Sequence, residues 1–166
     1  MKGLPRSLKK ATQTMNKVTI PVRSLSVSVA DGAPGFGTSV IAGLPQGNIL
    51  FLGAVAYLQF QTADADVTAT FDGDFSIGTA PTADNALAGS EVDIVPSTAF
   101  GAATAKLSPV IRGVSTDALG GLIIDNTAST LELNLNVLID DAAISGAAVF
   151  TVNGTVDLVY VVMGDD

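Results

Sequence analysis

Apolar and polar residues alternate along much of this chain, and a period of two is typical of β-strands with one buried face. The clearest case is residues 131–140. The apolar side chains there share one face: Leu131, Leu133, Leu135, Val137 and Ile139. The polar ones share the other: Glu132, Asn134, Asn136 and Asp140. The pattern predicts a strand with one dry side and one wet side.

Other segments predict further strands. The candidates are residues 18–29, 49–61, 67–77, 92–95, 110–111 and 122–124. Proline cannot donate a hydrogen bond to a neighbouring strand, so Pro21 places the first of these at an edge or breaks it there, and Pro96 ends the fourth. The mostly apolar segment 49–61 is expected to be long and central.

Two segments leave alternatives open. Asn153-Gly154 lies between β-rich flanks in residues 149–163, which fits either a hairpin turn or a glycine bulge in one long strand. Residues 99–106 fit either a short helix or an extended stretch. The long loop at 78–90, rich in Gly, Ala, Pro, Thr and Asp, is of a length that usually serves function or contact.

No segment sustains the 3.6-residue period of a helix, and turn clusters at residues 31–37 and 44–48 separate short strands. The chain is therefore expected to be all-β, with a single β-sandwich or barrel domain at residues 18–166. Residues 1–15 have no useful period, so residues 1–17 are expected to form an extended N-terminal arm.

Composition narrows the chemistry. The 166 residues include no Cys, His or Trp, which excludes disulfides, Ser-His-Asp triads and histidine-ligated zinc. Glu91 and Glu132 are the only glutamates, and nothing pairs any two acidic residues across a substrate. We expect a non-enzymatic protein with no cofactor and no small-molecule substrate.

Charge is divided unevenly between the arm and the body. Six of the eight basic residues lie in the first 23 positions: Lys2, Arg6, Lys9, Lys10, Lys17 and Arg23. Residues 1–30 carry +6, and residues 31–166 carry 2 − 16 = −14. The arm is either a solubilising tail or a partner-binding segment that lies on an acidic neighbour, another copy or a shell protein. Nucleic acid is disfavoured as a partner, because the acidic body follows within a few residues.

Four aspartates form a candidate cation site. Asp64, Asp66, Asp72 and Asp74 could supply oxygen ligands to a structural cation, but the spacing of a calcium loop is missing and aspartate also favours turns, so no metal is expected.

The longest apolar run, residues 49–58, is half the length that spans a bilayer, and no signal-peptide core precedes Asp31. The sequence thus predicts no membrane partner and no export.

Three stretches carry a resemblance to a known family. They are residues 43–54 (GLPQGNILFLGA), 72–82 (DGDFSIGTAPT) and 161–166 (VVMGDD). They resemble small virion proteins of tailed bacteriophages, of the capsid decoration or cement type. The resemblance implies a jelly-roll-like body, made in the host cytoplasm, that sits as a homotrimer on the outer capsid surface of the virion and ties neighbouring copies of the major capsid protein together.

The alternative hypothesis is a surface-associated or carbohydrate-binding β-sandwich module. Such modules normally present exposed aromatic side chains to the sugar. With two Tyr, seven Phe and no Trp, the sequence offers few candidates for that role.

Overall fold

The computed structural model describes residues 15–116, 121–128 and 130–164, and its fold is all-β, as the sequence predicts. In chain order the strands are β1 (Met15–Ala30), β2 (Gly35–Gly43), β3 (Gly47–Gln61), β4 (Gly73–Gly78), β5 (Val95–Ala99), β6 (Ile111–Val114), β7 (Leu122–Asn126), β8 (Glu132–Ile139) and β9 (Ala148–Gly164). Two short 3₁₀ helices among the described residues are η1 (Gly89–Glu91) and η3 (Asp141–Ala143).

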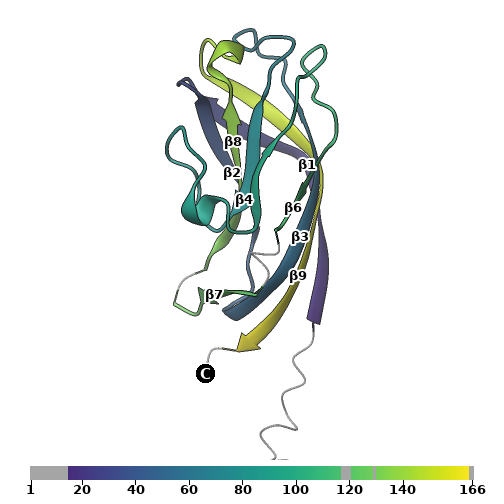
Figure 1. The fold of residues 1–166 in the computed structure, drawn as a ribbon, viewed down its shortest axis with the longest axis vertical. Coiled ribbons are helices and arrows are strands. Elements are labelled where there is room, and N and C mark those ends of the chain that lie inside the picture. The colour runs from purple at the N-terminus through teal and green to yellow at the C-terminus, as the bar shows by residue number, and fades with distance from the viewer. Residues whose placement is uncertain (1–14, 117–120, 129, 165–166) are drawn as a thin grey trace, which may run out of the picture.

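The strands form one antiparallel sheet that curls almost closed. Its order is β5-β4-β8-β2-β1-β9-β3-β6, and β7 also pairs with β3. The two ends of the sheet meet: a Cβ atom on Gly113 of β6 would lie 2.8 Å from the side chains of Phe75 in β4 and Val95 in β5. The result is a β-sandwich with one layer of β1, β9, β3, β6 and β7 and another of β2, β8, β4 and β5 (Figure 1).

Aromatic side chains fill the space between the layers. The fully buried phenylalanines are Phe60, Phe71, Phe75, Phe100 and Phe150. The ring centroids of Phe60 and Phe100 lie 4.8 Å apart, and those of Phe71 and Phe150 lie 5.1 Å apart. Ring pairs at these separations add to the stabilisation from burial, so the two layers are held together by one continuous core.

Strand β1 runs straight through Pro21, but its two edges differ. It pairs with β9 along most of its length, and it pairs with β2 only at residues 28–30. Pro21 therefore lies on a stretch with no second partner strand among the described residues, and a bulge follows between Val22 and Leu25. The edge position predicted for Pro21 is confirmed. The strand starts at Met15, so residues 15–17, which the sequence assigned to the arm, belong to the sheet.

Strand β9 is continuous, so the predicted hairpin at Asn153-Gly154 is wrong and the reading as one long strand is confirmed. Gly154 has a φ of +149°, and a Cβ atom there would collide with the carbonyl oxygen of Tyr57. The irregular register lies opposite, in β1, where the backbone N–H of Ser24 donates to Asn153 Oδ1 at 2.9 Å.

Two other expected elements differ from the structure, and one of the two alternatives for residues 99–106 is excluded. Of residues 67–77, only Gly73 onward is strand, while Val67 forms an isolated bridge with Ile144. The predicted strand at 92–95 is shifted to β5, which contains Pro96; β5 ends the sheet, where a missing N–H costs no ladder bond. Residues 99–106 form no helix.

Strand β8 contradicts the prediction of one dry and one wet face. Asn134 is 3% exposed and Asn136 is 0% exposed, so both faces of the strand are buried. The apolar face packs into the core, as expected. The polar face is covered by a loop from the same chain.

Candidate interaction surfaces

The loop between β4 and β5 covers the outer face of the β2-β8-β4 layer, and buried Asn136 holds it there. The Asn136 side-chain NH₂ donates to the carbonyl oxygens of Ala80 and Glu91, both at 3.0 Å. Its Oδ1 accepts from Thr82 N at 2.8 Å and from Thr38 Oγ1 at 2.9 Å. The amide thus makes four hydrogen bonds, which satisfies its donors and acceptors.

Further contacts fix the rest of this loop. Asp93 accepts hydrogen bonds from Thr79 N at 2.9 Å and Thr79 Oγ1 at 2.6 Å, and Ser76 Oγ donates to the carbonyl of Glu91 at 2.7 Å. Burial raises the pKa of the Asp93 carboxyl above its ordinary value, while the bonds from Thr79 act in the opposite direction. At the far end, Asn85 Nδ2 donates to the carbonyl of Ala33 at 2.8 Å. The contacts that the structure shows for this loop are therefore with other parts of the same chain, the sheet and the loop between β1 and β2.

The outer face of the other layer, formed by β1, β9, β3, β6 and β7, is exposed. Residues opposite one another in antiparallel strands share a face, and the register aligns Met15, Val161, Leu50 and Ile123 in one row across four strands. Met15 is 65% exposed and Ile123 is 60% exposed. Leu52 and Tyr57 of β3 are also exposed, at 38% and 43%.

Charged groups are few on these five strands. They carry three cations, Lys17, Arg23 and Arg112, and two carboxylates, Asp125 and Asp157, for a net charge of 3 − 2 = +1. Since the whole chain carries −8, the remainder carries −8 − 1 = −9. We call this surface, the outer face of β1, β9, β3, β6 and β7, the neutral face.

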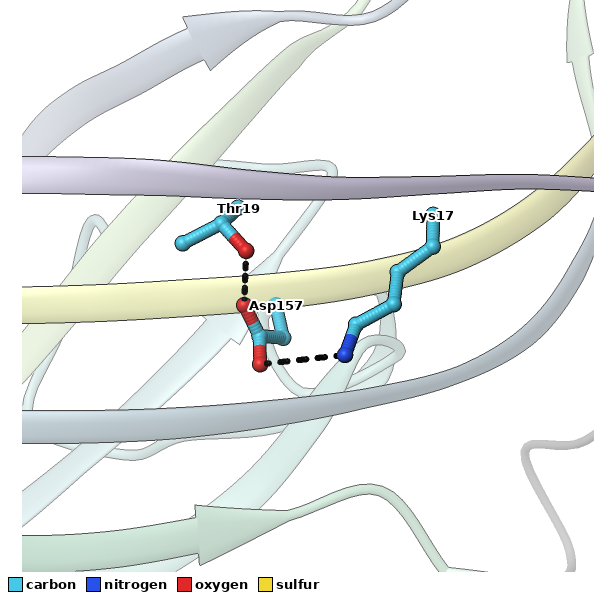
Figure 2. Close-up of polar contacts among 3 residues, drawn as sticks. All are labelled: Lys17, Thr19 and Asp157. Carbon is cyan, nitrogen blue, oxygen red and sulfur yellow. Dashed lines mark hydrogen bonds and ion pairs between the residues drawn. The ribbon is translucent and has the colours of Figure 1, made fainter.

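An open hollow of about 280 Å³ lies in the neutral face. Its lining is mostly small or apolar: Gly53, Ala54, Val55, Val114, Ser115 and Val159, with Lys17 and Asp157 also contributing. Lys17 Nζ lies 3.9 Å from Asp157 Oδ2, and Thr19 Oγ1 donates to Asp157 Oδ1 at 2.5 Å, so the carboxylate joins β1 to β9 (Figure 2). The hollow thus combines apolar walls with one cation and one anion.

The six predicted partner-binding residues do not form one described site. Lys2, Arg6, Lys9 and Lys10 lie outside the described residues. Lys17 is in the neutral face, and Arg23 lines a second hollow of about 200 Å³ with Pro21, Val22, Leu25 and Ile41, where β1 and β2 diverge. Six residues of strand separate Lys17 from Arg23, which is about 20 Å.

Acidic residues gather at the opposite end of the body from Met15. Asp72, Asp74 and Asp140 lie close together there. Burial raises the pKa of the Asp74 carboxyl, and the nearby carboxylates of Asp140 and Asp72 raise it further. A hydrogen bond from Ser97 acts in the opposite direction. Asp64 and Asp66 lie in the loop that follows β3, at this same end (Figure 1). With 16 residues, β1 has a length along its backbone of about 50 Å, which is the upper limit for the distance between its two ends.

Two of the four aspartates of the candidate cation site accept hydrogen bonds from neighbouring backbone N–H groups. Asp64 Oδ1 accepts from the backbone of Asp66 at 3.2 Å, and Asp72 Oδ1 accepts from Gly73 N at 2.8 Å, which are turn contacts. Across residues 15–116, 121–128 and 130–164, no group of three or more acidic side chains is placed to hold a metal ion. No helix in the same part of the chain is both long and apolar enough to cross a membrane.

Comparison with known proteins adds little to these observations. No family model and no curated protein matches the chain. Three of the solved structures that overlap with it come from infectious bursal disease virus: the Gx strain (15% identity, TM-score 0.43), the Gt strain (13%, 0.42) and a VP2 subviral particle (9%, 0.42). They cover 88%, 87% and 90% of this chain, which spans about a third of theirs (33%, 32% and 33%). With TM-scores below 0.5, the overlap is no evidence of a shared function.

Sequence reasoning missed both surfaces described here. Asn134 and Asn136 were assigned to a wet face because their side chains are polar, although two amides in a strand could also have indicated a covering loop. The sequence does not predict the neutral face, because its apolar residues, such as Met15, Leu50 and Ile123, lie far apart in the chain and only the strand register brings them together.

Proposed function

We propose that the protein is a non-enzymatic structural component of a virus particle, of the capsid decoration type, which binds the major capsid protein on the outer surface of the shell. The observation that carries this proposal is the division of charge along an elongated body. A basic sequence segment precedes Met15 at one end, and the aspartate-rich loops lie at the other.

The described structure supports such a role in two ways. The long loop is fixed to the sheet by Asn136 rather than arranged around a cavity, and the carboxyls with raised pKa, Asp74 and Asp93, take part in local hydrogen bonds. A protein that joins other subunits needs a rigid body and contact surfaces, and this chain offers both. The trimer implied by the resemblance is not part of this proposal.

Co-sedimentation with viral shells assembled without this protein tests the proposal. We expect the full chain to bind, and we expect salt to weaken binding because the arm acts through its charge. Replacing Lys2, Arg6, Lys9 and Lys10 by Gln should weaken binding and flatten its salt dependence. Replacing Lys106, which lies outside both the arm and the neutral face, by Gln is the control, and it is compared with Lys10→Gln so that each variant loses one positive charge.

Deletion of the arm should stop at residue 14, because Met15 begins β1. A chain that binds no shells at low salt would refute the proposal. Unchanged binding of the four-residue variant would refute the role of the arm. Binding to glycans without binding to shells would favour the carbohydrate-binding alternative.

A further inference from the structure

The two layers of the sandwich leave their outer faces in different states. The β2-β8-β4 face is closed by a loop of the same chain, anchored on Asn136. The neutral face keeps Met15, Ile123, Leu52 and Tyr57 exposed. Met15, Val161, Leu50 and Ile123 form one apolar row across four strands, exposed at Met15 and Ile123 and buried at Val161. A continuous apolar surface of this kind is typical of an interaction site, which raises the question of what covers it.

We propose that the neutral face is a self-association surface, on which a second copy of this chain docks with its own neutral face. The first argument is charge. Two molecules of net charge −8 repel each other, but the remainder of the chain carries the −9 and the five strands of this face carry +1. Contact through this face therefore brings together the surfaces with the least like charge.

The second argument is that the charges on this face can complement themselves. Lys17 and Asp157 are adjacent, with their charged atoms 3.9 Å apart, and Lys17 is 69% exposed. In a two-fold contact, where residue i of one copy contacts residue j of the other, residue j of the first copy also contacts residue i of the second. Lys17 of one copy then meets Asp157 of the other, and the reverse contact forms by symmetry.

The third argument is shape. The hollow of about 280 Å³ is bounded by Gly53 and Val55 of β3, next to the exposed side chain of Leu52. A face that has a protruding apolar side chain beside a hollow can interlock with a copy of itself. Apolar side chains seated in such pockets contribute most of the affinity of protein interfaces.

This pairing goes beyond the proposed function and departs from the trimer implied by the resemblance, because like faces pair two at a time. Light scattering and sedimentation of the pure full-length chain over a range of concentrations test it. We expect reversible association to twice the mass of 16.7 kDa. A monomer at every concentration, or a trimer, would overturn the inference.

Variants locate the contact. Leu52→Glu and Tyr57→Glu should each raise the dissociation constant at least tenfold. Val40→Glu on β2 is the matched control, because Val40 and Tyr57 are both 43% exposed. Equal effects at Val40, or none at Leu52 and Tyr57, would refute the assignment of this face. Thermal melting confirms that each variant is folded.

A charge exchange tests the proposed pairing of Lys17 with Asp157. Lys17→Glu and Asp157→Lys should each weaken association, and the double variant should restore it. Removal of residues 1–14 should leave association unchanged; if it abolishes association, the arm rather than the neutral face joins the copies. A monomer that still binds shells would refute this inference alone, and an associating protein that binds no shells would refute only the proposed function.

Discussion

The loop-covered layer and the neutral face differ in what contacts their outer sides. On β8, a buried amide with four hydrogen bonds holds a loop from elsewhere in the chain over the sheet. On β3 and β9, the outer face carries apolar side chains such as Leu52 and Tyr57, uncharged polar ones such as Gln59, Asn153 and Thr155, and one carboxylate, Asp157. None of these polar side chains is fully buried as Asn136 is. The comparison indicates that polar groups specify contacts within the chain here, while exposed apolar groups are left for contacts between chains.

Removal of the loop anchor should have the largest effect on stability. Asn136→Ala leaves the Thr82 N–H and the Ala80 carbonyl without their buried partner, and each unsatisfied group is costly. The Glu91 carbonyl loses one of two donors and keeps Ser76 Oγ. We expect the free energy of unfolding to fall by about 3 kcal/mol. Urea denaturation measures this, and hydrogen exchange should show the loop at residues 79–94 opening first.

Asn134→Ala is the control for that substitution. Asn134 is also buried, but its NH₂ donates only to the carbonyl of Glu132, two residues away, at 3.1 Å. Its loss should cost about 1 kcal/mol. Equal losses at the two positions would show that burial of the amide, rather than the bonds to the loop, is what matters.

The neutral layer should be most sensitive at its closest backbone approach. Gly154→Ala places a methyl group against the carbonyl oxygen of Tyr57 and forces alanine to a φ of +149°. Strain of this kind costs about 2 kcal/mol, so the unfolding midpoint in urea should fall. Gly43→Ala, where a Cβ atom meets nothing within 4 Å, should be nearly neutral. A neutral Gly154→Ala would mean that β3 and β9 can separate locally at no cost.

The strands were more predictable than their surroundings. Residues 49–61 and 131–140 follow long periodic patterns, and β3 and β8 appear there because burial in the core is what the periodicity reports. The polar face of β8 could not be assigned, since a loop that begins more than fifty residues earlier covers it. Local sequence cannot distinguish water from a distant segment as the partner of Asn136.

Residues typical of a turn form no turn where strand pairing on both sides is stronger. Asn153-Gly154 is a common hairpin pair, yet β1 and β3 pair with β9 on both sides there and keep it extended. Glycine serves close approach to Tyr57 instead of a turn. The charge division along the chain, in contrast, was visible directly, and the structure adds that two of the six basic residues, Lys17 and Arg23, lie in β1.

The pH dependence of the loop offers a smaller test. Burial raises the pKa of Asp93 above its ordinary value of 3.8. At pH values between 3.8 and the raised pKa, the folded chain therefore binds more protons than the unfolded chain. The contribution of Asp93 to stability therefore increases as pH falls from neutral through the raised pKa toward 3.8. In urea titrations at pH 7 and pH 4.5, Asp93→Asn should lose this component, so its stability relative to wild type should decrease at the lower pH. A relative stability that does not vary with pH would contradict the assignment.

The smallest effect on folding is expected at the ion pair of the neutral face. Lys17 is 69% exposed and its charged nitrogen lies 3.9 Å from Asp157, so solvent screens the attraction (Figure 2). Lys17→Ala should change the free energy of unfolding of the monomer by less than about 0.5 kcal/mol. The same substitution should weaken association of the pure protein, because in the proposed contact Lys17 pairs with Asp157 of the other copy where solvent screens the attraction less. Measured side by side, denaturation at low concentration and sedimentation at high concentration separate the two roles. A loss of folding stability equal to that of Asn136→Ala would mean that this charge serves the fold, and the contrast between the two faces would no longer hold.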